Sequence, residues 1–173
     1  MLLGWGHRFN HFPARMIRSK LGAERFDGLF SFGLVRHPFD RLVSWFFYHK
    51  NLTMEYFNRE VYECTFQDWV LSGCPHHWQN TPHVTEGWLS SPLHQWEYFY
   101  DGESKIVDYI GRYEEMDSAL DAIFDKIGVP ATTLARTNLS TRETDYMKYF
   151  DQKSQDAAYE LLRRDFDLFG YEV

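Results

Sequence analysis

The sequence predicts a single α/β domain over residues 1–173, built around a mainly parallel β-sheet. The chain has 173 residues, of which 44% are apolar, and this is enough for one sizeable core but not for two independent domains. An apolar run at Leu29–Val35 leads through a short turn into an apolar helix, and a second run at Lys105–Ile110 is also followed by a helix. Strands that alternate with helices in this way are typical of parallel sheets covered by helices.

The first part of the chain is expected to form a helix, a strand and a second helix. A helix is predicted over Pro13–Leu21, because apolar side chains recur on one face, Pro is at the first helical position and Gly22 follows the last turn. Leu29–Val35 is apolar with little alternation, which suits a strand covered on both faces. Pro38 then fixes a helix-compatible backbone angle, and the apolar helix continues to about Lys50.

The remainder of the chain is expected to close the core. Residues 51–95 are rich in Pro, Gly, His, Asn and Trp, with one short helical stretch at Phe66–Leu71, and we interpret them as an excursion over the site. Lys105–Ile110 is predicted as a second core strand, and the helix after it ends at Gly128. Asp151 can cap a last helix whose apolar side chains complete the core.

Charge and composition exclude several classes of function. Eighteen basic residues against 25 acidic ones give a formal charge of −7, which disfavours nucleic acid as a partner. No stretch approaches the length of a bilayer span, so the sequence predicts no membrane span. Cys64 and Cys74 are too few for a disulfide-dense scaffold, and whether they pair stays open.

The strand-to-helix turn around Arg36 is the first candidate for a functional site. It follows the carboxyl end of one predicted strand and precedes the amino end of a helix, where α/β proteins commonly bind anions. The Arg36 guanidinium can grip a phosphate as a planar fork, and Ser44, two turns into the helix, can add a hydroxyl. The alternative is that Arg36 pairs with Asp40 and that Ser44 only allows close packing. The residues alone leave both interpretations open.

The segments FSFGLVRHPFDRLVSWFFYH, IVDYIGRYEEMDSALDAI and NLSTRETDYMKYFD resemble segments of the sulfotransferases that use 3′-phosphoadenosine 5′-phosphosulfate (PAPS), especially the carbohydrate sulfotransferases. The segment FSFGLVRHPFDRLVSWFFYH resembles their 3′-phosphate-binding motif, with its Arg-x-Pro-[Phe/Ile/Trp]-[Asp/Glu]-Arg-Leu-Val-Ser pattern. IVDYIGRYEEMDSALDAI resembles a family strand followed by Gly-[Arg/Lys]-[Tyr/Phe]-Glu, and NLSTRETDYMKYFD resembles the segment before the last helix. The resemblance runs from about His7 to the C-terminus, and it implies a three-layer, P-loop-like sulfotransferase fold.

The resemblance also implies a reaction and the residues that serve it. A sulfuryl group would pass from PAPS, as co-substrate and without a metal, to a hydroxyl on a glycan or another small molecule. Arg36 and Ser44 would hold the 3′-phosphate of the nucleotide. Ser140 and Arg142 would belong to a segment that closes on it, although an exposed, solvated Arg142 is an equal alternative.

His11 resembles the histidine base of the family. Its place just before a helix start favours the neutral imidazole, which can accept the proton of a substrate hydroxyl. His7 is the nearest competitor. From the residues alone, either histidine can equally cap a helix or lie half exposed.

One family feature has no counterpart before His7 in this sequence. Family members carry an N-terminal strand that ends in a Pro-Lys-x-[Gly/Ala]-[Ser/Thr]-like loop, which cradles the 5′-phosphosulfate. The missing loop leaves two alternatives open: the natural protein begins upstream of Met1, or this chain is a shortened relative. In either case we expect this sequence to form an N-terminally truncated fold with exposed sheet edges, and thus to tend to form homodimers or to aggregate. The absence of this loop also leaves a second function open, in which the chain is a non-catalytic nucleotide-binding or interaction module derived from the same fold.

A metal site is the remaining alternative. Cys74, His77 and His83 lie close together in the sequence, and their side chains are ones that Zn²⁺ accepts. Their spacing fits no familiar zinc signature, so the sequence favours a site without a metal.

Overall fold

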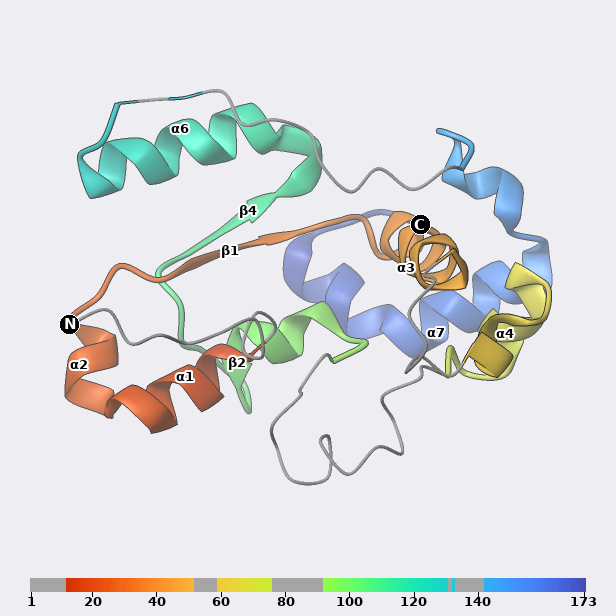
Figure 1. The fold of residues 1–173 in the computed structure, drawn as a ribbon, viewed down its shortest axis with the longest axis horizontal. Helices are drawn as coiled ribbons and strands as arrows, with labels where there is room; N and C mark the ends of the chain where they lie inside the picture. Colours follow the sequence, from red (N-terminus) through yellow and green to blue (C-terminus); the bar gives the residue numbers. More distant parts are fainter. Residues whose placement is uncertain (1–11, 52–58, 76–91, 131, 133–141) are drawn as a thin grey trace.

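Two short parallel strands form the centre of the fold (Figure 1). The computed structural model describes residues 12–51, 59–75, 92–130, 132 and 142–173. Strand β1 (Phe32–Val35) pairs in parallel with β4 (Tyr109–Arg112), with Phe32 opposite Tyr109 and Val35 opposite Arg112. A separate antiparallel hairpin joins β2 (Tyr100–Asp101) to β3 (Ser104–Lys105).

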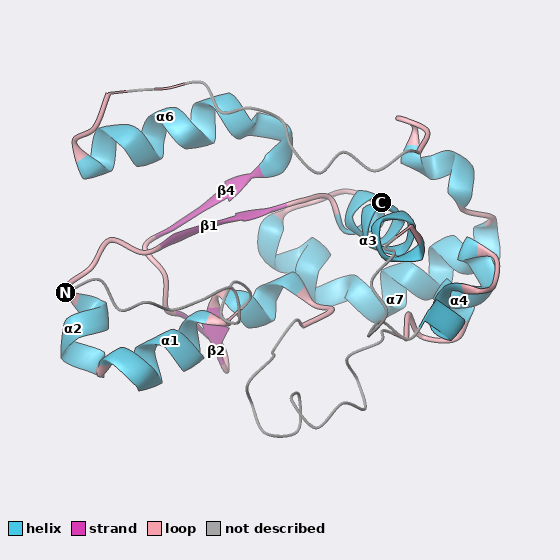
Figure 2. Cartoon of the chain, in the orientation of Figure 1, coloured by secondary structure: helices cyan, strands magenta, loops and turns pink. Residues whose placement is uncertain are grey.

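Helices lie on both sides of the parallel strand pair, as Figures 1 and 2 show. Helix α6 (Met116–Ile127) covers one side. Helices α1 (Ala14–Leu21), α2 (Ala23–Asp27) and α7 (Gln152–Phe169) lie on the other side. This layering of helix, sheet and helix confirms the predicted α/β fold class.

Two glycines in the strand pair allow neighbouring layers to approach closely. A Cβ atom on Gly111 would lie 2.7 Å from the Cβ atom of Ala119 in α6. A Cβ atom on Gly33 would overlap the ring of Phe99. A larger residue at either position would therefore force the layers apart.

The main core lies where α3 (Pro38–Lys50), α4 (Phe66–Leu71) and α7 meet. Its most completely buried side chains are Phe39, Leu42, Val43, Phe46, Trp69, Cys74, Ala158 and Leu162. The short helix α4 has the predicted bounds, but it belongs to this core. Aromatic and aliphatic side chains pack α4 against α3 and α7, so this part of the segment contributes to the core. The interpretation of residues 51–95 as an excursion over the site stays a prediction. The same core holds the start of α3 rigidly.

The helix ends follow the sequence signals closely. Pro38 is the first residue of α3, and Gly128 ends α6 in the left-handed conformation with φ of 70°. Asp151 and Ser154 form a capping box at the start of α7, in which the Asp151 carboxylate accepts from the Ser154 N–H at 2.7 Å. One detail differs, because Pro13 precedes the first turn of α1 instead of starting it.

The second core strand lies later in the chain than the sequence predicts. Lys105–Ile110 was the expected range, whereas the strand that pairs with β1 begins at Tyr109. The chain first turns back at Gly102, with φ of 60°, so that β3 pairs with β2. The Asp108 carboxylate then accepts hydrogen bonds from the backbone N–H and the hydroxyl of Ser31, at 2.7 and 2.8 Å. Parallel pairing starts only after this contact, and β1 is correspondingly shorter than the predicted range 29–35.

Candidate anion-binding site

Strand β1 ends directly before Arg36, and buried hydrogen bonds fix the backbone of this arginine. The Arg36 N–H donates to Gln95 Oε1 at 2.8 Å, and Gln95 Nε2 donates to the Arg36 carbonyl oxygen at 2.8 Å. Gln95 is only 4% exposed. Its own N–H and that of Trp96 both donate to the carboxylate of Asp165 on α7, each at 2.8 Å. A continuous network therefore connects α7 to the residue that begins the site.

The guanidinium group of Arg36 is held from two sides. Its Nε donates to Asp40 Oδ2 at 2.5 Å, and its central carbon lies 4.5 Å from the centre of the Tyr113 ring. Within the part of the chain that the structure describes, the two terminal nitrogens of Arg36 donate no hydrogen bond, and the side chain is 21% exposed. The guanidinium group is thus held in place, and its two terminal nitrogens have no hydrogen-bond acceptor among the described residues.

Arg142 reaches the same carboxylate from a distant part of the chain. Its Nη2 lies 2.5 Å from Asp40 Oδ1, and the two residues are 102 positions apart. The side chains of Arg142 and Asp40 are 10% and 12% exposed. We refer to Arg36, Asp40 and Arg142 as the Arg–Asp–Arg cluster. It carries one net positive charge in the first turn of α3, where the helix dipole also favours an anion.

The other predicted site residues differ in how far the structure places them. Ser44 follows Asp40 by one helical turn on the same face of α3. It is partly exposed, and its hydroxyl makes no hydrogen bond with any described residue. The pairing of Arg36 with Asp40, which the sequence left open, is confirmed, yet it occupies only the Nε atom of the guanidinium. His11 and Ser140 lie outside the described residues.

His37 is enclosed by aromatic rings next to the cluster. Its ring centroid lies 5.1 Å from those of Tyr146 and Tyr171, and 5.6 Å from those of Phe39 and Phe166. The Nε2 atom is 3.0 Å from a backbone carbonyl oxygen at residue 172, so in the neutral ring Nε2 donates the proton and Nδ1 carries the lone pair. Among the described residues, Nδ1 is the buried side-chain polar atom that has no partner. Protonating it would place an unpaired charge in an aromatic pocket.

Burial of His37 predicts a loss of stability in mild acid. Burial lowers the pKa of this imidazole from its ordinary value of 6.5, although nearby Glu114 and Asp40 act in the opposite direction. The unfolded chain therefore takes up this proton first, and the free energy of unfolding should fall as the pH drops below about 6.5. Urea unfolding at pH 7.5 and 5.5 measures the difference. The variant His37→Phe should lose less stability than the wild type over this interval, and equal losses would contradict this account.

Two residues that organise the site were not predicted from the sequence. Asp165 is fully buried and falls within the apolar stripe of α7, and a charged residue in such a stripe is a usable signal of a buried partner. Gln95 offers no comparable signal, because its partner is the backbone of a residue 59 positions away. The pattern of residues along a helix or strand reflects neighbours within that element, so it does not indicate such contacts.

The structure describes both cysteines but only one of the three residues suggested as metal ligands. Cys64 and Cys74 are both free thiols, and burial raises the pKa of the Cys74 thiol to about 12. No group of potential metal ligands occurs among the described residues, while His77 and His83 lie outside them. In the same part of the chain, no helix is long and apolar enough to cross a membrane.

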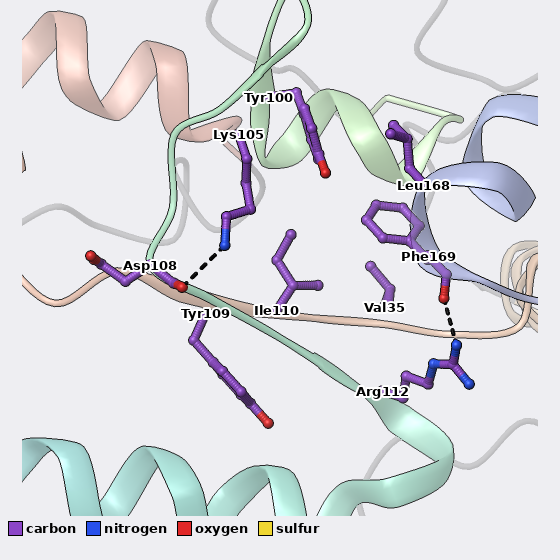
Figure 3. A pocket seen from close by; sticks show the side chains of 9 residues that line it. All are labelled: Val35, Tyr100, Lys105, Asp108, Tyr109, Ile110, Arg112, Leu168 and Phe169. Carbon is purple, nitrogen blue, oxygen red and sulfur yellow. Dashed lines mark hydrogen bonds between the residues drawn. The ribbon is translucent and has the colours of Figure 1, made fainter.

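A separate hollow borders the strand pair on the side away from α6 (Figure 3). It has a volume of about 330 Å³, and Val35 and Ile110 point from the strands into it. Two cations lie at its rim: Lys105 donates to the Asp108 carbonyl oxygen at 3.2 Å, and Arg112 donates to the Phe169 carbonyl oxygen at 2.6 Å. The Arg–Asp–Arg cluster does not line this hollow, although Arg36 directly follows Val35.

The fold and the site together define an α/β protein with paired guanidinium groups at the carboxyl end of a parallel strand. A profile described as "Sulfotransferase family" matches residues 8–172. The match covers nearly the whole sequence, and the chain belongs to the sulfotransferase family. An uncharacterized protein of Archaeoglobus fulgidus is 29% identical over 136 residues, which are 79% of this chain and 98% of that relative. No solved structure matches the chain at a significant level. The family match confirms the resemblance seen in the sequence and supports a sulfotransferase activity.

Proposed function

We propose that this chain transfers a sulfuryl group from PAPS to a hydroxyl group, with a carbohydrate as the acceptor. Membership of the sulfotransferase family supports the class of reaction. The nature of the donor and of the acceptor is our proposal. It is supported by the residues around the start of α3, whose chemistry suits the phosphate of a nucleotide.

The observation that carries the proposal is the held guanidinium group of Arg36, whose terminal nitrogens have no hydrogen-bond acceptor among the described residues. The N–H groups on the two terminal nitrogens of a guanidinium can donate to two oxygens of one phosphate, and this bidentate geometry distinguishes arginine from lysine. The Ser44 hydroxyl makes no hydrogen bond with any described residue and lies on the same face of α3 as Asp40, so it would add a donor to that phosphate. The donor set therefore fits a phosphate monoester, and we assign the 3′-phosphate of the nucleotide to Arg36 and Ser44.

Arg142 contributes the second positive charge of the proposed site. Because it shares Asp40 with Arg36, it lies near enough to compensate charge on the same phosphate. We propose that Arg142 and Ser140 act together when the nucleotide is bound. This assignment agrees with the resemblance of their segment to one that closes on the nucleotide.

PAPS supplies a sulfuryl group that is activated by its anhydride link to the 5′-phosphate. In the transfer, the acceptor hydroxyl oxygen forms a bond to sulfur, and the bond from sulfur to the bridging phosphate oxygen breaks. The products are a sulfate ester and adenosine 3′,5′-bisphosphate (3′,5′-ADP). We propose that His11 accepts the hydroxyl proton as a general base. Arg36, Ser44 and Arg142 would position the nucleotide for this transfer and offset its charge.

Incubation with ³⁵S-labelled PAPS and a panel of hydroxyl-bearing saccharides tests the proposal. We expect label in a saccharide product and an equal amount of released 3′,5′-ADP, both much reduced in Arg36→Ala. Binding of 3′,5′-ADP without turnover of PAPS would instead identify a non-catalytic nucleotide-binding module. A chain that neither binds 3′,5′-ADP nor consumes PAPS would contradict the proposal.

A further inference from the structure

We propose that Asp40 is a positioning residue, whose carboxylate aligns Arg36 and Arg142 for one ligand phosphate. The inference rests on the proposed function and concerns the same site. Its basis is that the two oxygens of the Asp40 carboxylate bind different arginines: Oδ2 accepts from Arg36 Nε and Oδ1 accepts from Arg142 Nη2, both at 2.5 Å. Each oxygen of Asp40 thus holds one guanidinium group.

Asp40 makes it possible for the two positive charges to lie close together. Guanidinium groups that share a site repel each other, and the repulsion is strong where little water screens it. The side chains of Asp40 and Arg142 are 12% and 10% exposed, so screening by solvent is limited here. The negative charge between the two arginines offsets the repulsion and leaves a net charge of one.

Asp40 also determines which nitrogens of Arg36 are left for a ligand. The bond to Asp40 occupies Nε, and the Tyr113 ring lies against the guanidinium group, so rotation of its plane is restricted. The terminal nitrogens are then the edge that a phosphate meets. Asp40 itself cannot shift easily, because it lies in the first turn of α3 beside the fully buried residues Phe39 and Leu42.

Positioning and simple electrostatics predict opposite results when the charge of Asp40 is removed. A carboxylate beside an anion site repels the anion, so electrostatics alone predicts tighter binding in Asp40→Asn. Positioning predicts weaker binding, because the amide nitrogen would face one guanidinium group and release it. The sign of the change in affinity therefore distinguishes the two.

Calorimetric titration of 3′,5′-ADP and of 5′-AMP into the full chain measures this sign. For Asp40→Asn we expect affinity for 3′,5′-ADP to fall about tenfold or more, which is the loss of one charge-assisted contact. Affinity for 5′-AMP, which lacks the 3′-phosphate, should change less than about twofold. Asp40→Glu, which keeps the charge, should lie between Asp40→Asn and the wild type. Asp156→Asn removes the same charge from an exposed position of α7 and should bind as the wild type does.

Each result of this titration bears on the inference. Unchanged or tighter binding of 3′,5′-ADP by Asp40→Asn overturns it, and so does an equal loss of both nucleotides, which a purely structural role would produce. Thermal unfolding shows whether Asp40→Asn is folded. If it is not, the Asp40→Glu variant replaces it in the titration. Selectively weaker binding of 3′,5′-ADP by Asp40→Glu then supports the inference, and unchanged affinity overturns it. Failure of the wild type to bind 3′,5′-ADP would instead refute the proposed function. Loss in Arg36→Ala without loss in Asp40→Asn would refute only the role of Asp40.

Discussion

Replacing Arg36 with alanine is expected to weaken binding of 3′,5′-ADP by at least about 2 kcal/mol, roughly thirtyfold in Kd. The variant removes the guanidinium group at the end of β1, and among the described residues it leaves Asp40 with Arg142 as its remaining partner. A part-buried carboxylate with less compensation would then repel the phosphate. Isothermal titration calorimetry of the wild type and the variant at one fixed salt concentration measures the loss.

Two matched variants separate the contribution of the bidentate guanidinium geometry to binding from that of the positive charge. Arg36→Lys keeps the positive charge without the bidentate geometry, and it should bind with an affinity between those of the wild type and Arg36→Ala. Arg163→Ala removes an exposed arginine from α7 and should leave binding unchanged. A loss smaller than about threefold in Arg36→Ala would mean that the 3′-phosphate is held elsewhere.

Replacing Asp165 with alanine is expected to cause the largest loss of stability, about 3 kcal/mol in the free energy of unfolding. The carboxylate is fully buried and accepts the N–H groups of Gln95 and Trp96. Its removal leaves both donors buried without a partner, together with a small cavity in α7. Urea unfolding followed by tryptophan fluorescence gives the difference.

The same substitution should also weaken ligand binding at the proposed site. Gln95 holds the backbone of Arg36 in both directions, so a displaced Gln95 frees the end of β1. We expect Asp165→Ala to weaken 3′,5′-ADP binding severalfold even at temperatures where the variant is folded. Asp167→Ala changes an exposed aspartate of the same helix and should alter neither quantity. A stable Asp165→Ala variant, or one that binds as the wild type does, would contradict the proposed connection through Gln95.

Local signals in the sequence predicted most helices but misplaced a strand. Helix α3 was predicted from Pro38 to Lys50, because a proline at the first position and an apolar run specify it locally. The second core strand begins later than its apolar run suggests, since the Asp108 contact to Ser31 determines where pairing with β1 starts. Such a contact joins residues 77 positions apart, and hydrophobic periodicity does not report it.

At the site, too, residues of one local segment could be predicted from the sequence, whereas contacts between distant segments could not. Arg36 and Ser44 could be singled out because they share one strand-turn-helix segment. The meeting of Arg142 with Asp40 depends on how two distant segments fold together, and the sequence showed only that Arg142 belonged to a candidate loop. The role of Gln95 follows from contacts to backbone atoms, which carry no residue-specific pattern. The place of Asp165 in the apolar stripe of α7 signals a buried partner but does not identify it.

The central claim is that the terminal nitrogens of Arg36, beyond the end of β1, bind the 3′-phosphate of the nucleotide. A crystal structure of the chain with bound 3′,5′-ADP tests it most directly. We predict that oxygens of the 3′-phosphate lie within hydrogen-bonding distance of both terminal nitrogens of Arg36 and of the Ser44 hydroxyl. A nucleotide bound elsewhere, with the Arg36 fork facing solvent, would contradict the claim.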